Sequence, residues 1–362
     1  MMNKVARYRG ISNGKPITKE PGYIYVTEDG ITIVDELRKE HVIPAKEAMD
    51  EQNASDKSEA SADMTAILAR LQMLEDKVNS MKKANSDSVV AEEGTPIAAS
   101  DPDKDFVISG DTNQTADITA KSVEMDGMTV DLPADAPLTN GNGMFINASD
   151  EVVISGSEVS MDKSTSSNCI KVVEAETMTI KDTTFSGTTY NTIMTGQNST
   201  NFLKNMIIDN CDFNEDCKHI NIWFAGYQDN ATLTISNCHF RGGEQFLCIS
   251  DFAGTDNKLT VNLVNCVIDQ YQKDGTKYEG IILMDGRNVN AGEFEEKNPF
   301  GNGKVTININ NVTVAGEKLT ADNFIMGNGG AGQMLYMYKA KEKANVAYSE
   351  ETANLFPTIN FK

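Results

Sequence analysis

The sequence has few of the features that mark membrane-spanning or exported proteins. No run approaches the ~18 consecutive apolar residues of a membrane-spanning helix. The first residues, MMNKVARYRGISNGKP, lack the apolar segment of a secretory signal. We therefore expect a soluble chain that does not use the Sec route and has no membrane partner.

Cysteine and histidine are also scarce. The 6 cysteines among 362 residues are too few for a disulfide scaffold, and no CxxC pair occurs. The 3 histidines show no zinc-binding spacing. We therefore expect no metal and no cofactor, and a chain that folds in a reducing compartment.

Basic residues are outnumbered by acidic ones. The 32 Lys and Arg residues against 53 Asp and Glu residues leave a formal charge of −21. Such a charge repels nucleic-acid phosphates and anionic lipids, so we predict no nucleic-acid partner. Hydrophobic residues make up 40% and aromatic residues 7%, with a single tryptophan, which disfavours one large core.

The N-terminal third divides by composition into modules and linkers. Residues 1–48 combine β-rich runs with turn signals, and the Asp-Gly pair in PGYIYVTEDGITIV predicts a hairpin. Residues 49–60 and 84–104 are polar and predict solvated linkers. Residues 61–83, between the two linkers, have the pattern of a helix.

This helix has the apolar spacing of a coiled coil, with alternate steps of three and four residues. Leu71 at an a position beside Ile67 at a d position favours a coiled coil of more than two helices, so we predict a homotrimer. A helix packed against its own domain would show the same spacing, but the polar linkers favour the oligomer. The expected trimerisation residues are Met64, Ile67, Leu71, Leu74, Val78 and Met81.

An internal repeat dominates the remaining sequence. Alternating apolar residues lead to a turn residue, a small residue and a further apolar residue, most clearly in MIIDNCDF, LTISNCHF and VNLVNCVI. The turn residues at 127, 156, 182, 210, 237, 265 and 311 are Gly, Asp or Asn, which tolerate a left-handed backbone. The long last gap predicts an insertion near 270–304.

Short strands repeated about every 27 residues are typical of a parallel β-helix. Residues 105–315 resemble the pectate-lyase-like family, whose signature is an asparagine ladder at a tight turn. The predicted fold class is therefore all-β: a right-handed parallel β-helix, preceded by a small β-rich domain and a short trimeric coiled coil. Residues 316–362 break the repeat and are expected to cap it. The ladder residues are Asn210, Asn237, Asn265 and Asn311.

Three cysteines share one inward position on consecutive coils: Cys211, Cys238 and Cys266. Thiols at such a position fill a core as small apolar groups. A metal site there would need a fourth ligand and ionised thiolates inside the core. We therefore predict that these cysteines serve packing.

The outward positions of the coils carry few groups suited to catalysis. By register, Asp212 and His239 are neighbours on adjacent coils and form the best acid–base pair available. Asn221, Trp223 and Asp251 lie on the face where enzymes of the resembled family bind sugar. Asn221 and Trp223 are the expected glycan contacts. No cluster of carboxylates converges, so we expect no enzyme, with Asp212, His239 and Asp251 as the catalytic candidates.

The order of the modules is that of a fibre. It resembles the head fibre (capsid decoration) proteins of crAss-like and related tailed phages of gut Bacteroidales. The resemblance implies that residues 1–48 bind the major capsid protein or another capsid protein. It also implies assembly in the host cytoplasm and a place on the capsid exterior of the virion, where the β-helix contacts host surface glycans. A tailspike-like polysaccharide depolymerase and a bacterial surface adhesin are the alternatives.

Overall fold

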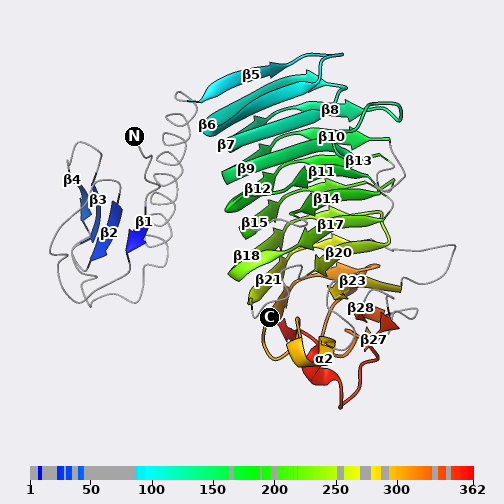
Figure 1. Cartoon of the computed structure of the whole chain (residues 1–362). Coiled ribbons are helices and arrows are strands. Elements are labelled where there is room, and N and C mark those ends of the chain that lie inside the picture. The colour runs from blue at the N-terminus through cyan, green and yellow to red at the C-terminus, as the bar shows by residue number, and fades with distance from the viewer. Residues whose placement is uncertain are drawn as a thin grey trace. The chain divides into compact units, whose positions relative to one another are not determined.

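The structure is a computed structural model of the chain (Figure 1). It describes the backbone of 7–9, 23–27, 30–34 and 40–44, and residues 86–362 except 163–166, 188–189, 197–202, 215, 218, 251–256, 270–278, 287–292, 328–332 and 340–343. The chain divides into two units, Met1–Ser80 and Met81–Lys362. The predicted linker 49–60 and the predicted coiled coil 61–83 lie outside the described residues.

The first unit contains a small four-stranded sheet. Its strands are β1 (Arg7–Arg9), β2 (Tyr23–Thr27), β3 (Gly30–Val34) and β4 (Glu40–Pro44). β2 pairs antiparallel with β3, with Tyr23 opposite Val34, which confirms the predicted hairpin. β1 lies parallel to β2, and β4 lies antiparallel to β3.

The second unit is nearly all β, and its strands form one long, mostly parallel sheet. Each strand pairs with the equivalent strand of the next turn of the chain, so that the strands form three stacks (Figure 1). The first stack consists of β5 (Asp87–Ala91), β6 (Ile97–Thr112), β7 (Ala116–Asp126), β9 (Asn142–Ser155), β12 (Thr177–Lys181), β15 (Leu203–Asp209), β18 (Tyr227–Ser236), β21 (Leu259–Val264), β24 (Val305–Asn310) and β30 (Thr358–Phe361).

The other two stacks complete each turn. The second stack contains the first halves of β6, β7 and β9, followed by β11 (Asn168–Val172), β14 (Asn191–Thr195), β17 (Ile220–Ala225), β20 (Gln245–Ser250), β23 (Glu279–Gly286) and β28 (Gln333–Lys339). The third stack consists of β8 (Thr129–Leu132), β10 (Glu158–Met161), β13 (Thr184–Ser186), β16 (Asp212–Phe213), β19 (His239–Phe240), β22 (Val267–Ile268) and β25 (Thr313–Val314).

The tight turns between the first and third stacks depend on residues that accept a left-handed backbone. Asn210, Asn237, Asn265 and Asn311 have φ between 50° and 55°, as the repeat predicted. The Asn265 amide donates to the Asn237 Oδ1 at 3.1 Å, and the Asn311 amide donates to the Asn265 Oδ1 at 3.0 Å. The Asn237 amide departs from the pattern, because it donates to Asp209 at 2.8 Å.

The core lies between the three stacks and is filled by aliphatic, methionine and phenylalanine side chains. The predicted packing role of the thiols agrees with their environment. Cys211, Cys238 and Cys266 are buried and free. The Cys266 Sγ lies 3.4 Å from the carbonyl oxygens of Ile235 and Val264, so the thiol also satisfies backbone acceptors.

Two predicted boundaries are wrong. Residues 84–104 are not a linker, because β5 and the start of β6 lie there and pair in parallel with the turn that follows. Small inward residues such as Ala91 and Ala99 fill this end of the core, so the segment has the composition of a linker although it is a strand region. The stack also continues beyond residue 315, because β28 pairs with β23 and β30 pairs with β24.

Short elements interrupt the last turns of the chain. The helix α2 (Phe294–Lys297) lies between β23 and β24, within the predicted insertion. β26 (Glu317–Lys318) pairs antiparallel with β25, and β29 (Ala344–Asn345) pairs antiparallel with β28. β27 (Met326–Gly327) pairs in parallel with β28. A 3-10 helix at Ala353–Leu355 precedes β30. No described helix is long and apolar enough to cross a membrane.

Candidate functional site

The predicted acid–base candidates lie on the outward side of the third stack. Asp212 of β16 is the register partner of His239 of β19, which confirms that they are neighbours on adjacent turns. The two side chains nevertheless bind different partners. Asp212 forms an ion pair with Arg241, and the His239 Nε2 lies 2.7 Å from Asp269 Oδ2. Neither group is therefore held as the acid or base of the other.

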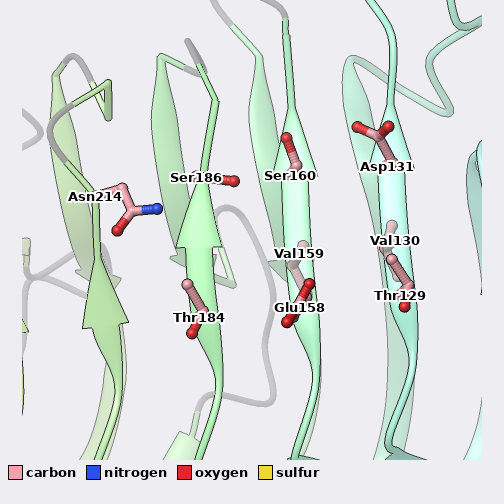
Figure 2. Close-up of a pocket in the computed structure, with 9 residues that line it drawn as sticks. All are labelled: Thr129, Val130, Asp131, Glu158, Val159, Ser160, Thr184, Ser186 and Asn214. Carbon is pink, nitrogen blue, oxygen red and sulfur yellow. The ribbon is translucent and has the colours of Figure 1, made fainter.

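A shallow polar groove of about 350 Å³ lies on the same side of the third stack (Figure 2). Its middle is lined by the short side chains of Ser160, Thr184 and Ser186, which leave the hollow between bulkier neighbours. Asp131 and Glu158 line it at the β8 and β10 end, and Asn214 lines it at the β16 end. The groove offers hydrogen-bond donors and acceptors to a polar ligand.

The chemistry of this groove is limited. No histidine, cysteine, lysine or aromatic side chain lines it, so it offers no ring for stacking on a sugar. Within the part of the chain that the structure describes, no three His, Cys, Asp or Glu side chains gather as they would around a metal ion. The groove therefore supplies the hydroxyls of its serine and threonine residues and the carboxylates of Asp131 and Glu158.

A second candidate surface lies on the outward side of the second stack. Trp223, Cys248, Leu283 and Tyr336 are register partners on β17, β20, β23 and β28. With Ile220 and Tyr338 they form a small apolar cluster that is separate from the core. We call these six residues the outer patch. Ile220, Cys248, Leu283 and Tyr336 are at most 5% exposed, so the partly exposed rings of Trp223 and Tyr338 are those that a ligand can reach.

Polar groups adjoin the outer patch. The Trp223 Nε1 donates a hydrogen bond of 2.8 Å to the Ser250 Oγ, which fixes the orientation of the indole. Asp285 is the register partner of Ser250 and is 3% exposed. The rings of Tyr336 and Tyr338 meet edge to face at 5.1 Å. Burial raises the pKa of Tyr336, so its hydroxyl stays protonated and can donate a hydrogen bond.

One edge of this surface carries a carboxylate–imidazole pair. The His219 Nδ1 lies 2.9 Å from Glu244 Oε2, and the imidazole ring lies 4.2 Å from the ring of Tyr190. The charge of Glu244 also contributes to the raised pKa of Tyr336. Apolar rings beside a carboxylate, an imidazole and hydroxyls can bind a sugar, because sugars present both C–H faces and hydroxyl groups.

The structure separates the residues that the sequence placed on this face. Trp223 lies outward and is partly exposed, as predicted. Asn221 is 0% exposed, so its expected contact with a glycan is wrong. Every residue of β20 and all but one residue of β17 are buried. A residue that faces away from the core on these strands is therefore not exposed to solvent. Asp251 lies outside the described residues.

Sequence reasoning did not find His219, Glu244, Tyr336 or Tyr338. The spacing between each tight turn and the next strand of the second stack varies, so the sequence does not align these positions between turns. Tyr336 and Tyr338 also lie beyond the recognisable repeat. The only available signal was the pair of alternating tyrosines in QMLYMYK, which is typical of a strand.

The chain matches none of the protein-family models, curated proteins or solved structures with which it was compared.

Proposed function

We propose that this chain is a structural protein of a phage virion, a trimeric head fibre attached to the capsid through residues 1–48. In this proposal the second unit is a right-handed parallel β-helix, and residues 61–83 form the trimeric coiled coil. The supporting observation is the parallel stacking of equivalent strands, turn after turn, from β5 to β30. Connections between parallel strands of one sheet are right-handed in ~98% of cases, which supports a right-handed β-helix.

The stacking suits a rigid spacer. Side-chain hydrogen bonds join adjacent turns at the tight corner, as from Asn265 to Asn237. On the third stack, Asp212 forms an ion pair with Arg241 and His239 lies beside Asp269, so the predicted acid–base candidates are engaged in other contacts. These features favour a structural role over the depolymerase alternative.

The proposed attachment follows from avidity. A coiled coil holds three N-terminal modules together, so that modest contacts of each module with the capsid add up to strong binding. The charge of −21 on each chain keeps neighbouring fibres from adhering to one another or to DNA. Free, buried thiols agree with assembly in a reducing cytoplasm.

Electron microscopy of phage particles with gold-labelled antibodies against residues 105–315 tests this function. We expect gold on the outer surface of capsids from the phage that encodes the chain. The matched control is a phage whose copy lacks residues 1–48, for which we expect antigen in the lysate but unlabelled capsids. Gold on the tail tip, or undiminished capsid labelling of the truncated form, would overturn the proposal.

The outer patch is the surface that we propose for contact with host glycans. Its partly exposed rings are those of Trp223 and Tyr338, and Tyr336, Ser250 and Asp285 beside them are buried. The partly exposed rings can stack on the C–H face of a sugar, and the hydrogen bond to Ser250 holds the Trp223 indole in place. This contact is separable from capsid attachment, which the proposal assigns to the other unit.

Trp223 makes this contact directly measurable, because it is the only tryptophan of the chain. We expect capsular polysaccharide from a host strain to change the intrinsic tryptophan fluorescence, since a sugar on the indole alters its solvent contact. Trp223→Phe serves as the silent control. Trp223→Ala should weaken retention on immobilised polysaccharide about tenfold, which corresponds to ~1.4 kcal/mol.

Two results would argue against this assignment. Unchanged fluorescence at polysaccharide concentrations where the chain is retained would remove the outer patch as the contact. Shortened polysaccharide chains after incubation would favour the depolymerase. Asp212→Ala and His239→Ala would then test whether those side chains carry the cleavage.

A further inference from the structure

The outward side of the first stack has an unusual composition over its last four strands, β18, β21, β24 and β30. Alternate residues of these strands face away from the core, as their burial patterns show. Apart from Asp229 near the start of β18, none of these outward residues is charged. We call this surface the neutral face; it consists of Thr232, Thr234, Ser236, Thr260, Asn262, Val264, Thr306, Asn308, Asn310, Thr358 and Asn360.

Other outward surfaces of the same unit are charged. In the third stack, Asp131, Glu158, Asp212, Arg241 and Asp269 all lie outward. The sequence as a whole is 23% charged and carries a formal charge of −21. An uncharged surface in such a chain is suited to a place where charge would be costly, because a charged group loses its hydration when a partner covers it.

The amide groups of the neutral face already bind one another. The Asn308 Nδ2 donates to the Asn262 Oδ1 at 2.9 Å, and the Asn360 Nδ2 donates to the Asn308 Oδ1 at 3.0 Å. The Asn262 Nδ2 donates to the Thr234 hydroxyl at 3.4 Å. A polar group that has its hydrogen-bond partner can be covered at little cost, whereas an unpaired group cannot.

The neutral face continues with an apolar residue. Ile207 of β15, the register partner of Thr234, is 39% exposed. The register partner of Ile207 on β12 is Thr179. The four strands β18, β21, β24 and β30, stacked at about 4.8 Å, give the neutral face a height of about 14 Å. The neutral face therefore consists of threonine methyl groups, paired amides and Val264, and on β15 it is followed by Ile207 and the charged Asp209.

We propose that the neutral face is the surface through which this chain packs against a second copy of itself. The proposal rests on the homotrimer that is part of the proposed function, and it names the surface that joins the copies. Two chains of charge −21 repel each other, so the copies approach most easily through a surface without charge. The interface is modest in size, and the coiled coil would supply the high effective concentration that it needs.

A polysaccharide is a less suitable occupant of this surface. Part of the hydrogen-bonding capacity that a sugar would use is already taken here, because the amides of Asn308 and Asn360 each donate to the adjacent asparagine of the ladder. The surface also offers no aromatic ring for stacking, unlike the outer patch. These two differences favour a protein partner with an equally flat surface.

Cysteine labelling of the full-length chain tests the proposal, because the native thiols are buried and an introduced thiol can be labelled selectively. Thr306→Cys places a thiol on the neutral face. Thr313→Cys is the matched control, since it changes the same residue type in the same turn of the chain but on the third stack. Both side chains are half-buried within one chain. In the native protein we expect maleimide to label position 306 at least tenfold more slowly than position 313. In urea we expect the two positions to be labelled at equal rates.

Light scattering of the same samples supplies the second readout. A mass that is a multiple of 39.5 kDa together with protection at position 306 supports the proposal. A single-chain mass, or equal labelling of the two positions in an oligomer, overturns it. Neither readout depends on capsid binding, so failure of the head-fibre function in the gold-labelling experiment is a distinguishable result.

Discussion

Replacing Phe213 by alanine is expected to lower the free energy of unfolding of the second unit by about 4–5 kcal/mol. Phe213 is fully buried and lies between two other phenylalanines in the core. Its ring centroid is 4.9 Å from that of Phe185 and 4.6 Å from that of Phe240, and both contacts are stacked. Truncation removes the side chain from two aromatic contacts and leaves a cavity between them.

The position of Phe213 within the stack should make this cavity costly. Phe185, Phe213 and Phe240 are register partners on β13, β16 and β19, which are held at a fixed spacing by the parallel backbone pairing. The neighbouring turns therefore cannot collapse into the gap without losing hydrogen bonds. The cost should lie in the upper part of the range for phenylalanine truncation.

Urea unfolding followed by circular dichroism measures this effect, with Phe213→Leu as the control. Leucine keeps most of the buried volume but removes the aromatic contacts, so we expect a loss of about 1–1.5 kcal/mol. An alanine variant that loses less than about 2 kcal/mol would contradict the stacked arrangement. We also expect the alanine variant to unfold in two steps, because each turn contacts only its neighbours and a weak central turn divides the stack.

The stacking itself could be predicted from the sequence because its signal is local. A left-handed turn residue such as Asn237, followed by the small residue Cys238 and the inward Phe240, recurs at a nearly constant interval. The same periodicity fixed the register in which Asp212 and His239 are neighbours. Alternation of inward and outward residues then followed from strand geometry.

The ends of the stack were less predictable. The first turns are formed by polar and small residues, and their left-handed position is Gly110 with φ of 93°, which lies outside the Asn pattern. The last turn returns as Thr358–Phe361, far from the tight turn at Asn311. In both places the strand is stabilised by backbone pairing with an adjacent turn, although its sequence lacks the repeat pattern of the central turns.

The outer patch was not predictable because it depends on contacts between distant segments. Trp223 and Tyr336 lie on strands that are three steps apart in the second stack and more than 100 residues apart in sequence. The partner choice of Asp212 likewise depends on Arg241, which reaches it diagonally from the next turn. A register assigns neighbours but does not determine which long side chain reaches which partner.

Raising the pH from 8 to 10 is expected to lower the free energy of unfolding by about 5 kcal/mol. Four buried thiols carry this effect. Burial raises the pKa of Cys217 to about 11 and that of Cys266 to about 12, from an ordinary value of 9.0. Burial also raises the pKa of Cys169, and a hydrogen bond with Cys211 followed by burial raises that of Cys238.

The direction of this pH effect follows from the protonation of the thiols in the folded and the unfolded chain. Below pH 9 the thiols are protonated in both the folded and the unfolded chain, so the stability does not depend on them. Above pH 9 the thiols of the unfolded chain ionise while those of the folded chain stay neutral, which favours unfolding. At pH 10 each thiol contributes a loss of about 1.4 kcal/mol, and the loss grows until the pH reaches the folded-state pKa.

The repeat supplies a matched control for this titration. Ser157 and Thr183 occupy the position of Cys238 in earlier turns, and their hydroxyls donate at 2.8 Å to the carbonyl oxygens of Ser155 and Lys181. A hydroxyl is therefore accommodated at this position. Cys238→Ser should fold and lose about one quarter of the pH dependence between pH 8 and pH 10, as measured by urea unfolding in the presence of a reductant. An unchanged pH dependence in this variant, or a wild-type stability that stays constant up to pH 10, would show that the thiols are not held neutral by the core.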